Sequence, residues 1–195
     1  MGVVFGLGNP GSRYERTRHN VGFRVLDRLV ARWGAKRADT TPAYWSWRAE
    51  AGSRVVHLVA PRTFMNLSGA ALEGWRSFHG LAAADLLVVA DDVYLPIGVV
   101  RLRTAGSSGG HRGLESIEAA LPGRDFARLR VGVGGVEDSE QLPEHVLEEF
   151  DEREEEAVIR AVEAAADAVE VWALEGPVAA MNRFNRRVRK EVHEE

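Results

Sequence analysis

Short apolar runs that alternate with amphipathic stretches constrain the fold of this chain more than any other feature of its sequence. Continuous apolar runs at residues 3–7 and 86–90 have the length and composition of buried strands. Apolar residues recur at helical spacing in stretches that begin near Asn20, Ser68, Leu114 and Asp151. Strands that alternate with helices are typical of the α/β class, in which helices cover a sheet.

Turn residues, and the alternation of apolar with polar residues, predict the remaining strands and helices. Further strands are predicted at residues 44–49, 54–60, 99–103 and 126–133. The side chains of Asn20 and Ser68 are expected to cap the helices that follow them, and residues 35–42 are expected to form a loop. A long helix at 151–174 is broken by Gly176-Pro177, and a shorter one follows at 181–188. We therefore predict one α/β domain over residues 1–195, with a twisted mixed sheet covered by helices on both faces and C-terminal helices from about residue 151.

Composition narrows the class of protein. The hydrophobic fraction of 45% suits a packed core, and no apolar run reaches the roughly 18 residues of a membrane span. Cysteine is absent, which excludes disulfides and thiolate chemistry and fits a cytoplasmic protein. The net charge is −4, but arginines concentrate at residues 13–32 and 101–130, and acids at 137–156. An acidic protein with segregated charge can still present a basic face to phosphates.

The loop at residues 6–20 follows the first predicted strand and contains a GxGxxG pattern. In a dinucleotide-binding fold the helix begins at these glycines, so that its N-terminal N–H groups meet a pyrophosphate. Here Pro10 and eight residues from Ser12 to His19 precede the expected helix. This spacing disfavours a nucleotide site.

Residues 106–110 contain a GxSxG pattern around Ser108, which is typical of the nucleophile elbow of serine hydrolases. The elbow needs one sharp turn, whereas this segment is long and rich in glycine. Of the later histidines, His145 lies in an acidic segment and His193 in the tail, so both suit a triad poorly. We interpret the segment as a mobile flap beside a ligand, with backbone N–H groups free to bind. A serine esterase that uses Ser108 stays open as a less favoured alternative.

Five polar residues follow predicted strands, where open α/β sheets bind their ligands: Asn9, His19, Asn66, Asp91 and His111. A carboxylate beside an imidazole makes a general base, because it fixes the tautomer and stabilises the imidazolium. Asparagine amides can donate to a developing oxyanion. Since no serine or cysteine suits the histidine as a nucleophile, the set favours direct attack by water.

The sequence resembles the bacterial-type peptidyl-tRNA hydrolases along essentially its whole length. The opening VVFGLGNPGSRYERTRHNVGF is similar to that of the family, and other family motifs follow in order: PRTFMNLSG, Asp91-Asp92, Leu95-Pro96-x-Gly98, GSSGGHRGLESI, FARLRVGVG, HVLEEF and Met181-Asn182-Arg183. The resemblance implies hydrolysis of the ester between a peptide and the 3′ ribose of tRNA, which recycles tRNA from prematurely released peptidyl-tRNA.

The resemblance also implies roles for individual residues. His19 matches the catalytic base, Asp91 its orienting carboxylate, and Asn9 the residue that distinguishes blocked from free amino ends. Other positions match contacts to peptide or tRNA, and the basic ones could meet phosphates of the acceptor arm: Tyr14, Phe64, Met65, Asn66, His111, Arg103, Arg128 and Arg130. No metal and no cofactor is expected, and the protein is expected to act as a monomer without a membrane partner.

Two positions depart from the family pattern. Arg112 stands where the family usually has Asn after the flap histidine, and Tyr94 stands where an acid usually precedes Leu-Pro. Arginine is longer than asparagine and suits phosphate, so Arg112 is expected to shift a tRNA contact or narrow the cleft. A catalytically silent tRNA-binding relative is therefore a second alternative, although the retained His19, Asp91, Asn9 and Asn66 oppose it.

Overall fold

A computed structural model of the chain describes residues 1–123, 125–136 and 138–185. At its centre, the described strands form one seven-stranded sheet in the order β2-β3-β4-β1-β5-β7-β6. The strands are β1 (Gly2–Gly6), β2 (Lys36–Thr40), β3 (Tyr44–Ala51), β4 (Arg54–Pro61), β5 (Leu86–Asp92), β6 (Val100–Arg103) and β7 (Ala127–Gly132). The four central strands β4, β1, β5 and β7 are parallel, and the outer three run antiparallel to their neighbours. The predicted mixed sheet is confirmed.

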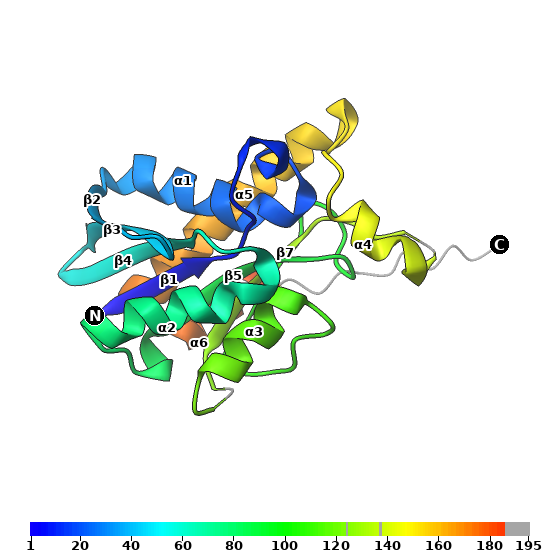
Figure 1. Cartoon of the computed structure of the whole chain (residues 1–195). Coiled ribbons are helices and arrows are strands. Elements are labelled where there is room, and N and C mark those ends of the chain that lie inside the picture. The colour runs from blue at the N-terminus through cyan, green and yellow to red at the C-terminus, as the bar shows by residue number, and fades with distance from the viewer. Residues whose placement is uncertain (124, 137, 186–195) are drawn as a thin grey trace.

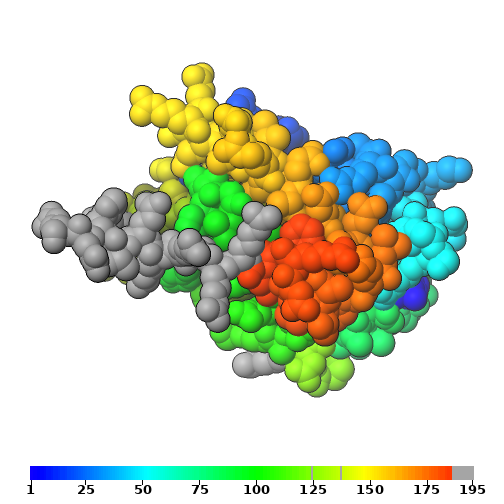
Figure 2. Space-filling view, turned by 180° about the vertical axis from the view of Figure 1, so that it is seen from behind, coloured from blue at the N-terminus to red at the C-terminus, as the bar shows by residue number. Residues whose placement is uncertain are grey.

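Helices cover both faces of this sheet, as predicted. The described helices are α1 (Val21–Trp33), α2 (Ser68–His79), α3 (Arg112–Ala120), α4 (Leu142–His145), α5 (Glu152–Glu175) and α6 (Pro177–Phe184). Helices α2 and α3 pack on one face, and α1, α5 and α6 on the other, while α4 lies beyond the end of β7 (Figure 1). Figure 2 shows α5 and α6, in orange and red, side by side on the back of the molecule. No helix among the described residues is both long and apolar enough to span a bilayer.

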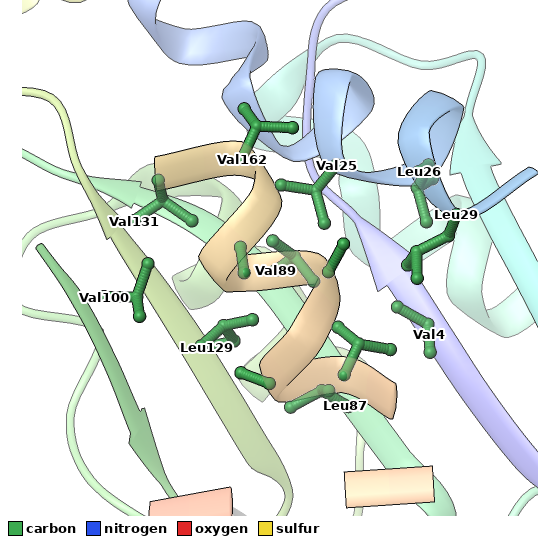
Figure 3. Packing of buried hydrophobic residues seen from close by; sticks show 14 of the residues in the cluster. Val4, Val25, Leu26, Leu29, Leu87, Val89, Val100, Leu129, Val131 and Val162 are labelled. Carbon is green, nitrogen blue, oxygen red and sulfur yellow. The ribbon is translucent and has the colours of Figure 1, made fainter. Parts of the chain in front are cut away.

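The central strands are apolar throughout because both of their faces are buried. In β1, Val4 packs with α1 and α5, whereas Val3 and Phe5 face α2 and α3. Figure 3 shows the first of these cores, where Val89 and Leu129 of the sheet meet side chains of α1 and α5. Strands covered on both faces are expected to be continuous apolar runs, which explains the pattern at residues 3–7 and 86–90.

The order of the strands places a crevice at the carboxyl ends of the central strands. Strand β1 lies between β4 and β5, and the helix after β1 packs on the opposite face from the helix after β4. Loops that diverge in this way leave a binding crevice between them. A close approach of α1 to the end of β1 shapes the crevice, since a Cβ on Gly22 would lie 2.3 Å from the Leu7 carbonyl oxygen. Only glycine allows this contact, which places the residues before α1 directly over the sheet edge.

Several local predictions were wrong. Residues 36–40 form the edge strand β2 rather than a loop. Despite their polar composition, they pair with the edge of β3 that does not pair with β4. Asn20 does stand at the N-cap position of α1, but its side chain makes no capping bond and contacts Asn9 instead. Ser68 is the first residue of α2, and its hydroxyl donates to the Met65 carbonyl (2.8 Å) rather than capping the helix.

Helix boundaries also differ from the prediction. Helix α3 begins at Arg112 instead of near Leu114, because the side chain of His111 caps it. The short helix α4 was missed, since the acidic stretch around it resembles a loop. Helix α6 begins at Pro177 and ends at Phe184, and residues 186–188 of the predicted last helix lie outside the described residues. The long helix α5 agrees with the prediction and begins with a capping box made by Asp151 and Glu154.

Candidate active site

Three side chains meet at the carboxyl end of β5. Asp91 Oδ1 lies 2.8 Å from His19 Nδ1 and 2.8 Å from His111 Nε2. His19 comes from the loop after β1, and His111 from the end of the loop before α3. The structure thus brings together the His19 and Asp91 that the sequence singled out, and it adds His111 as a second imidazole on the same carboxylate oxygen.

The backbone around α3 and the carboxylate of Asp91 determine where the two imidazoles carry their protons. His111 Nδ1 accepts hydrogen bonds from the N–H groups of Gly113 (3.1 Å) and Leu114 (3.2 Å). A nitrogen that accepts carries no proton, so the proton of His111 is on Nε2, which donates to Asp91. An ionised carboxylate can only accept, so His19 donates from Nδ1. In the neutral imidazole, this tautomer keeps a lone pair on His19 Nε2, which is what a general base needs.

Asp91 is held in its ionised form. It is 2% exposed, and burial by itself raises the pKa of a carboxyl group. Electrostatic attraction to His19 and His111, together with the hydrogen bonds from their N–H groups, outweighs this effect and holds the pKa of Asp91 well below its ordinary value. The carboxylate therefore stays charged at neutral pH, where it can orient His19 and stabilise the imidazolium form of that side chain.

Two asparagines fix the loop that precedes His19. The Asn9 backbone N–H donates to Asn20 Oδ1 (2.8 Å), and Asn20 Nδ2 donates to the Asn9 carbonyl (3.0 Å). The side chain of Asn9 in turn accepts from the Met65 N–H through Oδ1 (2.8 Å). The amide Nδ2 of Asn9 is consequently the atom available to a ligand. Asn20 was missed as a site residue, although its place beside His19 in a polar loop was a usable signal.

The three-residue cluster lines a cleft of about 430 Å³. Asn9, Tyr14, Phe64, Met65 and Asn66 all line it, as do His19, Asp91, His111, Arg112 and Arg130. The rings of Tyr14 and Phe64 meet edge to face with centroids 6.2 Å apart. Nearly all of the predicted site residues therefore gather in one cavity, and Tyr94, which is 71% exposed, lies on its rim.

The α4 segment forms a wall of the cleft that the sequence did not reveal. Its apolar residues line the cavity: Leu142, Pro143, Val146 and Leu147. The segment also holds the loop that carries His19, because the His19 N–H donates to the Val146 carbonyl (2.8 Å) and the Arg18 N–H to that of Glu148 (2.9 Å). The Arg18 side chain is 8% exposed and pairs with Glu154 (2.7 Å). These bonds position the backbone of His19 from outside the sheet.

The arginines predicted to meet phosphates occupy different environments. Arg103 and Arg112 are exposed. Arg128 is 1% exposed and donates to Glu118 (2.9 Å) and to the Gly106 carbonyl (2.6 Å). Arg130 is 8% exposed and donates to Asp92 (3.3 Å) and to two carbonyls of the flap. Arg128 and Arg130 are thus paired with protein acceptors, although Arg130 also lines the cleft, and Arg103 and Arg112 are the more accessible of the four to a phosphate.

The same contacts attach the flap, residues 106–110, to the sheet. The carbonyls of three successive residues, Gly106, Ser107 and Ser108, accept hydrogen bonds from buried arginines. The Ser108 hydroxyl lies 3.3 Å from Glu115 Oε1, and the flap Gly110 N–H donates to it. A serine nucleophile would need a histidine at this hydroxyl, so the structure does not support the Ser108 elbow.

His19, Asp91 and His111 are also the one group with the spacing of metal ligands among the residues that the structure describes, with candidate atoms within 4.8 Å of one another. The hydrogen bonds do not suit a metal ion. The backbone places a proton on His111 Nε2, and both imidazoles direct N–H groups at the carboxylate oxygen that a cation would need. The geometry favours a hydrogen-bonded base.

Known proteins resemble this chain along nearly its whole length. The model of the peptidyl-tRNA hydrolase family matches residues 3–193. A peptidyl-tRNA hydrolase of Desulforamulus reducens is 41% identical over 187 residues, which are 96% of this chain and 90% of that protein. One from Roseiflexus castenholzii is 44% identical, over 95% and 87% of the two chains. The crystal structure of peptidyl-tRNA hydrolase from Acinetobacter baumannii superposes with a TM-score of 0.88 at 34% identity, over 95% and 94% of the two chains. On sequence and on fold, the chain belongs to the peptidyl-tRNA hydrolase family.

Proposed function

We propose that this protein hydrolyses the ester bond between a peptide, or an N-blocked amino acid, and the 3′ ribose of tRNA, with His19 as the general base. The observation that carries this proposal is the His19 side chain, held through its Nδ1 by a buried Asp91 inside the cleft. Membership of the family, together with the names of its relatives, supports the choice of ester.

The chemistry proceeds in two steps. His19 Nε2 accepts a proton from water while the water oxygen attacks the ester carbonyl, which gives a tetrahedral oxyanion. The intermediate then collapses, the bond to the ribose oxygen breaks, and the imidazolium of His19 returns the proton to that oxygen. Asp91 stabilises the imidazolium between the two steps, and general base catalysis of this kind contributes about 10²–10⁴ in rate.

The asparagines bind the acyl side of the substrate. Asn9 Nδ2 can donate to a main-chain carbonyl of the peptide or to the oxyanion, because Met65 already occupies its Oδ1. The exposed amide of Asn66 lies on the same cleft and can both donate and accept. Contacts of this type recognise main chain rather than side chains, which suits an enzyme that must accept any peptide. They also give Asn9 a means of distinguishing a blocked amino end from a free one.

The tRNA side of the substrate meets aromatic rings and exposed cations. Tyr14 and Phe64 offer ring faces and edges for an unpaired base of the acceptor end. Arg103 and Arg112 can contact phosphates without reading sequence. Arg112 lies next to His111 and lines the cleft, so its longer charged side chain can offer a phosphate contact there that an asparagine could not.

We further propose that the protein acts as a monomer in the cytoplasm, without cofactor or metal, on the acceptor arm and 3′ end of peptidyl-tRNA. The family supports the choice of substrate, and the proton-bearing network around Asp91 supports a site without a metal ion. Size-exclusion chromatography with light scattering tests the monomer, and a mass of two chains would contradict it.

Two alternatives make different predictions for one assay, the release of N-acetyl amino acid from N-acetyl-aminoacyl-tRNA. A silent tRNA-binding relative would bind tRNA and release nothing. A serine esterase would lose its activity in Ser108→Ala. We expect hydrolysis by the wild type and by Ser108→Ala, and slower hydrolysis of aminoacyl-tRNA with a free amino group. Loss of activity in Ser108→Ala, in a variant that remains folded, would contradict the water mechanism.

A further inference from the structure

Arg18, the residue directly before His19, is a buried arginine with no part in the two chemical steps. Its side chain is 8% exposed and lies outside the set of residues that line the cleft. The guanidinium covers the ring of Phe150, with its central carbon 4.7 Å from the ring centroid. Arginine is seldom so fully buried unless it is paired, so the partners of Arg18 indicate what its side chain does.

One arm of the guanidinium reaches the edge of the sheet that carries Asp91. Arg18 Nη1 donates to the carbonyl of Val133, just beyond β7, at 3.0 Å. The Val133 N–H in turn donates at 3.1 Å to the carbonyl of Asp92, which follows Asp91 in β5. Because His19 Nδ1 donates to Asp91, these contacts close a ring through the two strands and back along the chain to Arg18. The ring fixes the loop relative to the carboxylate that the imidazole contacts.

The guanidinium is also held at the start of α5. Nη1 and Nη2 of Arg18 donate to the two carboxylate oxygens of Glu154, at 3.1 Å and 2.7 Å. Glu154 is itself fixed, because its Oε2 accepts from the Asp151 N–H in the capping box of that helix. A bidentate pair of this kind sets the orientation of the guanidinium as well as its position. Arg18 therefore joins the loop that carries His19 to both β7 and α5.

We propose that Arg18 is a positioning residue of the peptidyl-tRNA hydrolase reaction, which holds the His19 imidazole at hydrogen-bonding distance from Asp91. This inference rests on the proposed function for its kinetic consequence. Without the guanidinium, the loop loses its links to β7 and α5, and the imidazole can shift relative to the carboxylate. Since the backbone N–H of Arg18 bonds to the α4 segment, the same residue also keeps that wall of the cleft beside the base.

The test variant is Arg18→Gln, which removes both the positive charge and the planar fork. The kcat for N-acetyl-aminoacyl-tRNA is expected to fall about 10²-fold, the size of effect that misplacing a group by about 1 Å can have. The KM is expected to stay at its wild-type value. Arg18→Lys keeps the charge beside Glu154 and should recover part of the lost kcat. A wild-type kcat in Arg18→Gln, or a change confined to KM, would overturn the proposal.

Arg24→Gln is the matched control. Arg24 also lies over the ring of Phe150, at 5.8 Å from its centroid, and pairs with Glu155, the residue after Glu154. This pair joins α1 to α5, whereas the pair of Arg18 joins the loop to α5. We therefore expect Arg24→Gln to keep the wild-type kcat. If it loses as much kcat as Arg18→Gln, the effect comes from the packing of α5 and the positioning role is wrong.

A phosphate contact is the competing role for an arginine in this loop. Losing one such contact should reduce the slope of log affinity for deacylated tRNA against log salt by about 0.7–0.9. Because Arg18 is buried and paired within the protein, the slope in Arg18→Gln is expected to equal that of the wild type. A reduction of that size would identify Arg18 as a phosphate ligand and refute the proposal.

A second readout does not depend on activity. The imidazole N–H protons of His19 and His111 that bond to Asp91 should give separate downfield proton resonances, assigned by their loss in His19→Ala and His111→Ala. In Arg18→Gln we expect the His19 resonance to disappear and the His111 resonance to remain, because the backbone of α3 holds His111. An unchanged His19 resonance would refute the positioning role even if the wild type did not hydrolyse peptidyl-tRNA.

Circular dichroism establishes whether Arg18→Gln folds. If it does not, Glu154→Gln takes its place, because glutamine keeps an oxygen for the Asp151 N–H of the capping box and removes the charge that holds Arg18. The expected result is a smaller fall in kcat together with a weakened His19 resonance. A wild-type spectrum and a wild-type kcat in Glu154→Gln would contradict the proposal.

Discussion

Replacing Asp91 with asparagine removes the charge at the centre of the site while keeping the shape of the side chain. In the wild type, Asp91 Oδ1 accepts from both imidazoles at 2.8 Å and is almost completely buried. Asparagine can still accept through its carbonyl oxygen, but it cannot stabilise an imidazolium by charge. Its NH₂ group also favours the wrong tautomer of His19 when it turns toward that ring.

The expected fall in kcat can be calculated from the charge separation that the reaction creates. When His19 takes the proton from water, its imidazolium centre stands about 4 Å from the carboxylate, and such a pair is worth about 4 kcal/mol at an effective dielectric constant of about 20. Each 1.36 kcal/mol corresponds to a factor of ten in rate, so kcat should fall about 10³-fold. Binding of tRNA should change little, because Asp91 does not contact the phosphates.

The assay is the initial rate of N-acetyl amino acid release at saturating N-acetyl-aminoacyl-tRNA, with binding of deacylated tRNA measured separately. Asp92→Asn is the matched control, since it makes the same change at the adjacent buried position, where the carboxylate contacts Arg130 and the Tyr94 N–H rather than an imidazole. We expect Asp92→Asn to lose less than about tenfold. An Asp91→Asn enzyme within about tenfold of wild type, or no slower than Asp92→Asn, would refute this account of the base.

Four further predictions concern stability and binding. Asn20→Ala leaves the buried N–H and C=O of Asn9 without partners, so the free energy of unfolding should fall by about 1–3 kcal/mol for each group; a urea melt unchanged from wild type would contradict this. Gly22→Ala places a Cβ against the Leu7 carbonyl and should cost about 1–3 kcal/mol, read as a lower thermal midpoint. Burial, followed by neighbouring positive charges, lowers the pKa of His57, so unfolded chains bind a proton that folded ones do not as pH falls below about 6.5. Stability should therefore drop from pH 7 toward pH 5, and less so in His57→Gln; equal slopes for the two proteins would exclude this role. Affinity for deacylated tRNA should fall steeply with salt, and a flat response would rule out the phosphate contacts.

The sequence predicted the central part of the fold because each central strand is buried on both faces. The runs at residues 3–7 and 86–90 needed no tertiary information to be identified as strands. Strand β2 could not be found in the same way. Its KRADT sequence is exposed at the edge of the sheet, and only pairing with β3 makes it a strand.

The candidate site was predictable where chemistry alone identifies a residue. His19, Asp91 and Asn9 carry groups that a hydrolase needs, and they lie at strand ends. Asn20 was assigned to a helix cap because asparagine before an apolar repeat usually has that role, whereas its side chain forms a pair of bonds with a residue eleven positions earlier. Such a contact depends on how the loop folds back, which no local pattern records.

Arg128 shows a second limit of the sequence. Its position in a strand rich in arginine suggested a basic surface, and the structure buries it between Glu118 and the flap. Arginine is seldom so fully buried unless it is paired, so composition alone favours the exposed interpretation. The acid that pairs with it, ten residues earlier on α3, becomes its neighbour only when α3 packs beside β7.

The central claim, that His19 activates water to cleave the peptidyl-tRNA ester, is tested most directly by single-turnover hydrolysis of N-acetyl-aminoacyl-tRNA with wild type and His19→Ala. The account predicts rapid release of N-acetyl amino acid by the wild type and a rate about 10²–10⁴-fold lower in His19→Ala, with affinity for deacylated tRNA retained. A wild-type enzyme that releases no N-acetyl amino acid, or a His19→Ala enzyme that releases it at the wild-type rate, would contradict the claim.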